Sequence, residues 1–393
     1  MATTAAAAQA GAPAPTLPET VAAALARYPD LPLSDAIRTQ GQALRTQASG
    51  LFAGDPSLMV RHESDAANDD AGYRQWETGV ALPLWLPGQR DRRLRVADAT
   101  ERESEATRRL HAWQVAGQIR ELLWSLQRAE AELVLAQRAL QSAKNLEADV
   151  ARRVQAGDLP RTDLILAHKE TLAREIDLAT AQSARDTGLA QYRHVTGLDS
   201  VPRDIRETAA AVSGISDDHP ALRAARETAA RAGADRDRVR AEKRANPVLT
   251  VGGKSERPEV GQDYASALIV EVNVPFGTRG QAAVNSATAE RSYVEASAAL
   301  TRAEQELEHD LHTAHAEREL AARSLELAGQ QQALSAQGLQ LTQRAFELGE
   351  GDLFMLLQAR AQELAAERDF ELRRLERGRA VARFNQALGV IPE

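Results

Sequence analysis

Hydrophobic and polar residues follow two different periods along this chain, and each period predicts a different kind of element. From Asp91 to Gln155 the sequence has no proline and a single glycine. Within that stretch apolar residues recur at steps of three and four, at Leu122, Leu126, Ala129, Leu133, Ala136 and Leu140. This spacing predicts one long α-helix. At ~1.5 Å per residue the helix spans roughly 100 Å, so it needs equally long partners in a coiled coil or a tube of helices.

Shorter elements precede the long helix. Residues 17–50 predict a lead-in helix that is interrupted near Pro29 and Pro32. Residues 57–64 and 73–86 are short runs bounded by Asp55-Pro56, by a polar turn at 67–72 and by Pro87-Gly88. They therefore predict a β-hairpin.

Glycine and proline mark the end of the long helix. Gly157 and Pro160 interrupt the periodic pattern, and Thr162 is placed to cap a returning helix that reaches about His194. The first half of the chain therefore predicts a lead-in helix, a β-hairpin and a long helical hairpin.

The same order of elements recurs later in the chain. Pro56 and Pro247 lie 191 residues apart in similar contexts, and Gly157 and Gly349 lie 192 apart. The copy predicts a lead-in at 219–244, strands at 248–256 and 264–276, a long helix at 280–347 and a return at 352–387. We infer an internal duplication. The predicted domains are a disordered leader or signal remnant at 1–16, a first repeat at 17–198, a linker at 199–218 and a second repeat at 219–390.

The predicted strands have two unlike faces. In 264–276 one parity carries Leu268, Val270 and Val272, whereas the other carries small or polar residues such as Ala267 and Glu271. This alternation is typical of a membrane β-barrel, although a sheet packed on helices gives it too. Four strands cannot close a barrel, because unpaired edges in lipid leave backbone groups unsatisfied. Three copies supply twelve strands and a matching helical tube, so closure favours a homotrimer with an α-barrel and a 12-stranded transmembrane β-barrel.

Composition narrows the function. A net charge of -8 without a basic block argues against nucleic acid as a partner. The sequence has Cys 0, so it offers no disulfide, no thiol nucleophile and no lipid-bearing cysteine. Ala8-Gln9-Ala10 resembles the end of a cleaved export signal. No catalytic or cofactor motif is evident, and Gly252-Gly253-Lys254-Ser255 lacks the first glycine and the helix of a phosphate-binding loop. We therefore expect no enzyme activity and no cofactor.

The order and spacing of several motifs resemble a known family. They are Asp55-Pro56, Leu82-Pro83-Leu84 through Pro87-Gly88-Gln89-Arg90, Pro275-Phe276-Gly277 through Arg279-Gly280, and Phe346-Glu347-Leu348-Gly349-Glu350-Gly351-Asp352-Leu353. Over residues 17–390 the chain resembles the TolC-like outer-membrane factors, most of all their heavy-metal efflux branch. The resemblance implies a passive channel in outer-membrane lipid that extends into the periplasm. It also implies a periplasmic adaptor and an inner-membrane RND-type pump as partners, with divalent heavy-metal cations as cargo.

On this interpretation the two helical turns are periplasmic tips. An adaptor is expected to dock at Gly157 and Gly349, on exposed Leu159 and Leu353. Acidic residues near the tips are candidates for a ring that narrows the lumen and attracts cations: Asp158, Asp163, Glu350 and Asp352. Plain helix turns and helix-capping acids explain the same residues.

Three histidines offer the only pattern with metal-ligand character. His309, His312 and His315 follow one another at three-residue steps on a predicted helix, next to Glu308 and Asp310. The pattern is weakly specific, and a solvated helix face is the preferred explanation. Two other classes therefore stay open: a periplasmic coiled-coil scaffold or adaptor, which does not predict duplicated strand pairs, and a helical metal-binding enzyme, which rests on these histidines alone.

Overall fold

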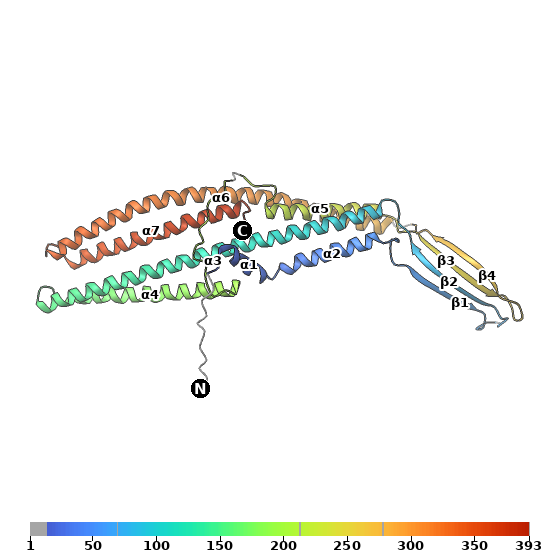
Figure 1. The fold of residues 1–393 in the computed structure, drawn as a ribbon, viewed down its shortest axis with the longest axis horizontal. Helices are drawn as coiled ribbons and strands as arrows, with labels where there is room; N and C mark the ends of the chain where they lie inside the picture. The colour runs from blue at the N-terminus through green and yellow to red at the C-terminus, as the bar shows by residue number, and fades with distance from the viewer. Residues whose placement is uncertain (1–13, 69, 212–213, 277–278, 393) are drawn as a thin grey trace, which may run out of the picture. The chain divides into compact units, whose positions relative to one another are not determined.

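The computed structural model describes residues 14–68, 70–211, 214–276 and 279–392. Most of the predicted leader, including Ala8-Gln9-Ala10, lies outside these residues. The elements are α1 (Leu17–Ala26), α2 (Leu31–Ser49), β1 (Ser57–Ser64), β2 (Arg74–Pro83), α3 (Gln89–Ala156), α4 (Arg161–Thr196), α5 (Pro220–Ala241), β3 (Val248–Arg257), β4 (Ala265–Asn273), α6 (Arg279–Glu347) and α7 (Leu353–Ala387), labelled in Figure 1. The predicted fold, mainly helical with two β-hairpins and long helical hairpins, is confirmed.

The order of elements repeats within the chain. Helix α2 is followed by a strand pair and then by the helical hairpin α3–α4, and α5 is followed by another strand pair and the hairpin α6–α7. The strands β2 and β4 are shorter than predicted at their carboxyl ends, at Pro83 and Asn273. Pro275, which has no N–H to donate to a neighbouring strand, lies just beyond the end of β4.

The start of α4 differs from the prediction. Pro160 is the N-cap residue and makes no side-chain capping hydrogen bond. Thr162 lies within the first turn of the helix, so the expectation that it caps α4 is wrong. Proline fixes an extended entry into this helix without a hydroxyl acceptor.

Contacts within the chain divide it into two compact units. The first consists of Met1–Leu31, His111–His219 and Glu306–Glu393, and the second of Pro32–Leu110 and Pro220–Gln305. Each unit draws residues from both predicted repeats, and the helices α3 and α6 each contribute to both. No helix of the described part is both long enough and apolar enough to cross a membrane.

The second unit contains the whole sheet. Its strands lie in the order β1-β2-β3-β4, and all neighbours are antiparallel. The central pair, β2 and β3, joins the two hairpins into one sheet. Gly252 allows these two strands to approach closely, because a Cβ at that position would clash with the carbonyl oxygen of Thr78. The segment from Gly252 to Ser255 is thus part of a strand, in keeping with the rejection of a phosphate-binding loop.

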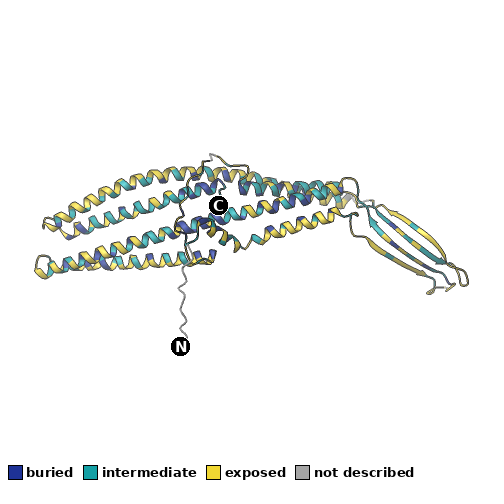
Figure 2. Ribbon diagram, viewed as in Figure 1, coloured by how far each residue is buried: buried dark blue, intermediate teal, exposed yellow. Residues whose placement is uncertain are grey.

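The first unit is built from long helices. Its main core gathers α1, α3 and α4 residues, with Ile119, Leu123, Leu126 and Tyr192 among the fully buried side chains. Figure 2 shows buried residues along α3 and near the carboxyl end of α7. At this end Arg120 is buried and donates hydrogen bonds to both carboxylate oxygens of Glu207, at 2.8 and 2.7 Å. This ion pair ties the linker between the repeats to the helices.

Candidate functional site: a two-faced sheet and two helical tips

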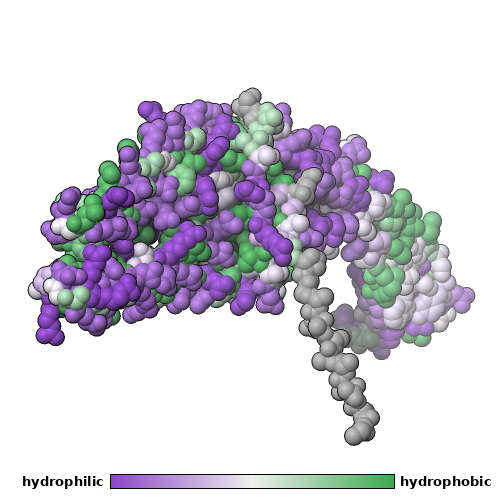
Figure 3. All heavy atoms as spheres, turned by 60° about the vertical axis from the view of Figure 1, so that its left-hand side comes forward, coloured by the Kyte–Doolittle hydropathy of each residue, from purple (hydrophilic) through white to green (hydrophobic). Residues whose placement is uncertain are grey.

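One face of the sheet is apolar and exposed. Leu58, Val80, Val251 and Val270 are paired in a row across the four strands, and each is 40–74% exposed. Leu268 and Val272 continue this face along β4. Paired positions share a face of a sheet, so these side chains form a continuous patch. Hydrophobic residues gather over the sheet in Figure 3.

The opposite face of the sheet is polar. Arg61, Glu77 and Lys254 occupy one row across β1, β2 and β3. Arg61 pairs with Glu63 at 2.9 Å, and Lys254 pairs with Glu256 at 2.6 Å. Because ions gather on one face and exposed aliphatic residues on the other, the sheet is suited to separate an apolar medium from water.

Both outer strands of the sheet have a free edge. Among the described residues β1 pairs only with β2, and β4 pairs only with β3. An open edge presents a row of unpaired N–H and C=O groups that another strand can pair with. The sheet is therefore suited to extension by strands of other chains.

The two helical tips share one turn geometry. Gly157 and Gly349 adopt φ of 86° and 79°, the left-handed conformation that favours glycine. At the first tip Asp158 N–H donates to the carbonyl of Arg153 at 2.9 Å, and at the second Glu350 N–H donates to that of Ala345 at 2.9 Å. Both glycines thus end their helices in the same hydrogen-bonded motif.

The predicted docking leucines are not equivalent. Leu353 is 2% exposed and belongs to a core cluster with Leu146, Phe346 and Leu356, so the expectation that it is exposed is wrong. Its place in the first turn of α7 points it at the neighbouring helices. Leu159 is partly buried against the same cluster.

Other apolar residues are exposed at the tips instead. The second tip exposes Leu348, Phe354 and Met355, and the first exposes Ile165 and Leu166. Sequence reasoning missed them, because an apolar residue beside a turn gives no periodic signal that separates exposure from burial.

The four predicted gate acids also differ from one another. Asp158, Glu350 and Asp352 are exposed, whereas Asp163 is partly buried in the first turn of α4. The Asp352 carboxylate accepts a hydrogen bond from the N–H of Met355 at 2.7 Å. Asp352 is therefore the N-cap of α7 and has a structural role.

The histidine strip does not converge on a point. His309, His312 and His315 are exposed along α6, and the described residues include no group of three metal-ligating side chains arranged to hold an ion. Successive three-residue steps drift around the helix. His315 lies 3.6 Å from Glu319 and packs edge-on against Phe384, which are ordinary helix-surface contacts.

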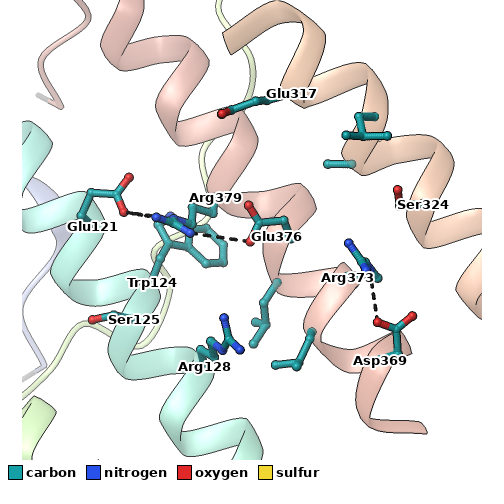
Figure 4. A pocket seen from close by; sticks show the side chains of 14 residues that line it. Glu121, Trp124, Ser125, Arg128, Glu317, Ser324, Asp369, Arg373, Glu376 and Arg379 are labelled. Atoms are coloured by element: carbon teal, nitrogen blue, oxygen red, sulfur yellow. Dashed lines mark hydrogen bonds and ion pairs between the residues drawn. The ribbon is translucent and has the colours of Figure 1, made fainter. Parts of the chain in front are cut away.

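A groove of about 520 Å³ lies along α3, α6 and α7 of the first unit (Figure 4). Glu121 accepts hydrogen bonds from Arg379 at 2.6 Å and Arg383 at 2.7 Å, and Arg383 also donates to Glu317 at 3.2 Å. Partial burial tends to raise the pKa of Glu121, but the two arginines outweigh it and hold the pKa below its usual value. The charges pair with each other and join three helices.

Comparison with known proteins identifies the class of fold. The chain is similar to VceC, an outer membrane protein from Vibrio cholerae, with a TM-score of 0.77 and 16% identity over 95% of this chain and 96% of that chain. It is similar to the CmeC outer membrane channel of Campylobacter jejuni, with a TM-score of 0.75 and 16% identity over 95% and 85%. It is also similar to the open state of the MtrE outer membrane channel of Neisseria gonorrhoeae, with a TM-score of 0.72 and 20% identity over 95% and 89%. The fold is that of outer-membrane channel subunits.

The sequence itself gives one further match. Residues 212–390, which include the second predicted repeat, match the family profile described as outer membrane efflux protein. No curated protein matches the chain in sequence.

Proposed function

We propose that this chain is one subunit of a homotrimeric outer-membrane efflux channel. The two-faced sheet carries this proposal. Its apolar face suits lipid, its charged face suits an aqueous lumen, and its two open edges require further strands. Three copies close a twelve-stranded cylinder in which every strand edge is paired.

The helical hairpins form the periplasmic part of the channel in this proposal. Their charged and polar surfaces suit water, and their tips expose apolar side chains at Ile165, Phe354 and Met355. A periplasmic adaptor protein docks on these side chains and on the turns at Gly157 and Gly349. Leu353 does not contribute to the docking surface, because it is buried in each chain.

Transport through the channel is passive. The ion pairs of Glu121 in the groove join helices to one another, which is a structural role. Two of the proteins with a similar fold are described as channels. The proposed source of energy is an inner-membrane RND-type pump, which passes cargo to the channel when the adaptor opens the tips. Cargo then diffuses out through the strand cylinder.

Divalent heavy-metal cations are the proposed cargo. Sequence resemblance to the heavy-metal efflux branch supports this choice, together with the exposed acids Asp158 and Glu350 at the tips. Threefold symmetry turns each acid into three carboxylates, which attract cations. Deleting the gene in its host is expected to lower resistance to divalent metals, and unchanged metal resistance with altered resistance to organic compounds would reject this cargo.

A pair of neighbouring substitutions in β4 tests the location of the sheet. Val270 lies on the apolar face and Ile269 on the polar face, and Val270 is the more exposed of the two in the single chain. Lysine facing lipid near the bilayer centre costs about 2–4 kcal/mol, whereas lysine facing a lumen is tolerated. Val270→Lys is therefore expected to prevent recovery of the protein in the outer-membrane fraction, and Ile269→Lys to leave it there.

If Ile269→Lys is the more damaging of the two variants, the sheet has a different environment from the one proposed. If the polar face were packed against protein and the apolar face met water, lysine at the less exposed Ile269 would be the damaging change. A chain that is recovered without detergent in both variants contradicts the proposal and favours a periplasmic scaffold.

A further inference from the structure

The sheet carries a surplus of positive charge at the end where α3 begins and α5 ends (Figure 1). Residues 89–95, at the start of α3, contain four arginines and one aspartate. Residues 235–246, at the end of α5 and in the turn before β3, contain five basic and three acidic residues. This surplus lies in a chain whose net charge is -8. The loops at the other end of the sheet, 65–72 and 258–263, carry five acidic residues and no basic one, so the two ends are oppositely charged.

Four of these arginines form no ion pair among the described residues. Arg90 donates hydrogen bonds to two carbonyl oxygens at the end of α2, at 3.1 and 3.0 Å, and Arg92 donates to the carbonyl oxygen of Asp237 at 3.4 Å. Arg95 and Arg244 are exposed and have no hydrogen bond within that part of the chain. These four residues are called the basic belt below. Their charges are not neutralised by carboxylates of the same chain, so they are available to an anion.

The fold turns Arg95 toward the apolar side of the sheet. The N–H of Leu84 donates to the carbonyl oxygen of Pro247 at 2.8 Å, so the alternation of β2 continues beyond the strand and gives Trp85 the parity of the polar face. The guanidinium of Arg93 lies over the Trp85 ring, 5.0 Å from its centroid. Two residues turn a side chain by about 200° around a helix, so Arg95 lies on the opposite side of α3 from Arg93.

Exposed apolar side chains extend the apolar face to this same end of the sheet. Val274 and Phe276 follow the apolar residues of β4 at two-residue steps, and they are 60% and 95% exposed. On the neighbouring strands this level is reached at Leu84 and Pro247. The arginines of α3 begin six residues after Leu84, and Arg244 stands three residues before Pro247. The apolar face and the basic belt therefore adjoin.

An anionic phospholipid matches both parts of this surface. Its acyl chains suit the exposed side chains of Val274 and Phe276, which water does not favour. Its phosphate accepts the charge-assisted hydrogen bonds that guanidinium groups donate. A zwitterionic lipid supplies the same chains with no net charge, and a free phosphate supplies the charge with no chains. Only the anionic lipid uses the apolar edge and the unneutralised arginines together.

We propose that the basic belt binds the headgroups of anionic phospholipids whose acyl chains cover the apolar face at Val274 and Phe276. The inference rests on the proposed function, because that function places the sheet in lipid. It adds which lipids the protein selects and at which end of the sheet it selects them. Basic residues beside a membrane surface attract anionic headgroups, and the attraction weakens as salt is added.

Two charge-matched variants test the selection of headgroups. Arg95→Gln with Arg244→Gln removes two exposed arginines that form no ion pair in the described part of the chain, so the fold is expected to be unchanged. The control, Arg128→Gln with Arg138→Gln, removes two exposed arginines of α3 that lie about 50 and 65 Å from Arg95 along the helix. Each protein is equilibrated in detergent with equal amounts of phosphatidylglycerol and phosphatidylcholine. Native mass spectrometry then counts the bound lipids of each kind.

The unmodified protein and the control are expected to retain phosphatidylglycerol in preference to phosphatidylcholine. In Arg95→Gln with Arg244→Gln the ratio of the two lipids is expected to fall by about fivefold or more, because one arginine near an anionic surface contributes about fivefold in affinity. The same ratio in all three proteins, or an equal fall in the variant and the control, overturns the inference. Displacement of the lipid by an equal concentration of glycerol phosphate also overturns it, because the ligand is then a soluble anion.

A third variant and the conductance separate this inference from the proposed function. Phe276→Ser is expected to lower the retention of both lipids by similar factors, because it shortens the apolar edge and leaves the charges in place. If Arg95 and Arg244 line the lumen instead, their substitution changes the ion preference of the channel and not the ratio of bound lipids, which overturns the inference. A conducting trimer without a lipid preference also overturns it and leaves the proposed function standing. A monomer that needs no detergent overturns both.

Discussion

The two helical tips show how one turn motif serves two different surroundings. Gly157 and Gly349 end α3 and α6 in the same left-handed conformation. After the turn the tips diverge, because α4 begins at Pro160 without a side-chain cap, whereas α7 begins at Asp352 with one. The second tip also buries Leu353, whereas Arg161, which stands 192 residues earlier at the start of α4, is exposed.

This difference shows that the second tip is anchored more firmly in its own chain. The capping hydrogen bond of Asp352 and the buried side chain of Leu353 both stabilise the start of α7. The start of α4 has no side-chain cap, and its nearest leucine, Leu159, is only partly buried. The comparison predicts that equivalent changes at the two tips have unequal effects.

The largest expected effect is the loss of Leu353. Leu353→Ala removes a fully buried side chain from the tip cluster, and such changes cost about 2–5 kcal/mol of unfolding free energy. The matched change Leu159→Ala affects a partly buried residue and is expected to cost less. Denaturant unfolding followed by circular dichroism measures both. Equal costs would contradict the comparison.

The next effect concerns the conformation of the turn. Gly349→Ala places a Cβ on a left-handed backbone and is expected to destabilise the protein by about 1–2 kcal/mol. Gly338 is a helical glycine with open space around its Cβ position, so Gly338→Ala is expected to stabilise by about 0.5–1 kcal/mol. Shifts of the melting temperature in opposite directions are the expected result. A shift of the same sign in both variants would reject the turn assignment.

Removal of the cap is expected to have a smaller effect. Asp352→Ala leaves the N–H of Met355 without its side-chain acceptor, which costs about 1 kcal/mol. Asp158 lies at the corresponding tip but caps no helix, so Asp158→Ala is expected to change stability by only a few tenths of a kcal/mol. Thermal unfolding distinguishes the two, and a larger loss for Asp158→Ala would refute the difference in capping.

Acid is expected to affect the first tip selectively. A hydrogen bond from Thr171, and then the contact with His168, hold the pKa of Glu147 below its usual value despite partial burial. A carboxylate with a lowered folded-state pKa contributes stability above its unfolded value and loses it as pH falls through the folded value. As the pH falls below about 4.3, the ordinary pKa of a glutamate, amides of α4 near His168 are therefore expected to exchange hydrogen faster.

The variant Glu147→Gln provides the control for this experiment. It removes the titrating group and is expected to abolish the acid-dependent part of the exchange near His168. Amides at the start of α7 lack this contact in the structure, so they are expected to respond less. An acid response near His168 that persists in Glu147→Gln at its original size would show that another group is responsible.

Much of the fold was predictable from periodicity and punctuation. The change between periods of about 3.6 and 2 residues separated helices from strands, and Gly157, Pro160 and Gly349 marked the turns. The strand β1 matches its predicted range of 57–64. The period of apolar residues and the glycines and prolines at turns are local properties of the sequence, so these elements can be predicted without knowing how they pack.

The exposure of particular side chains was not predictable in this way. Leu353 and Phe354 are neighbours with opposite burial, and only the packing of four helices decides which one points inward. The row from Leu320 to Leu348 has the spacing of a core strip and yet is exposed in one chain. The spacing of these leucines does not show what, if anything, covers them.

Single-channel recording shows whether the chain forms a channel. Protein extracted in detergent, with a trimeric mass confirmed by light scattering, is added to a planar lipid bilayer. Discrete conductance steps with cation preference are expected, and the double variant Asp158→Asn with Glu350→Gln is expected to show a lower preference. A stable trimer that produces no conductance, or a monomer that needs no detergent, would contradict the proposed channel.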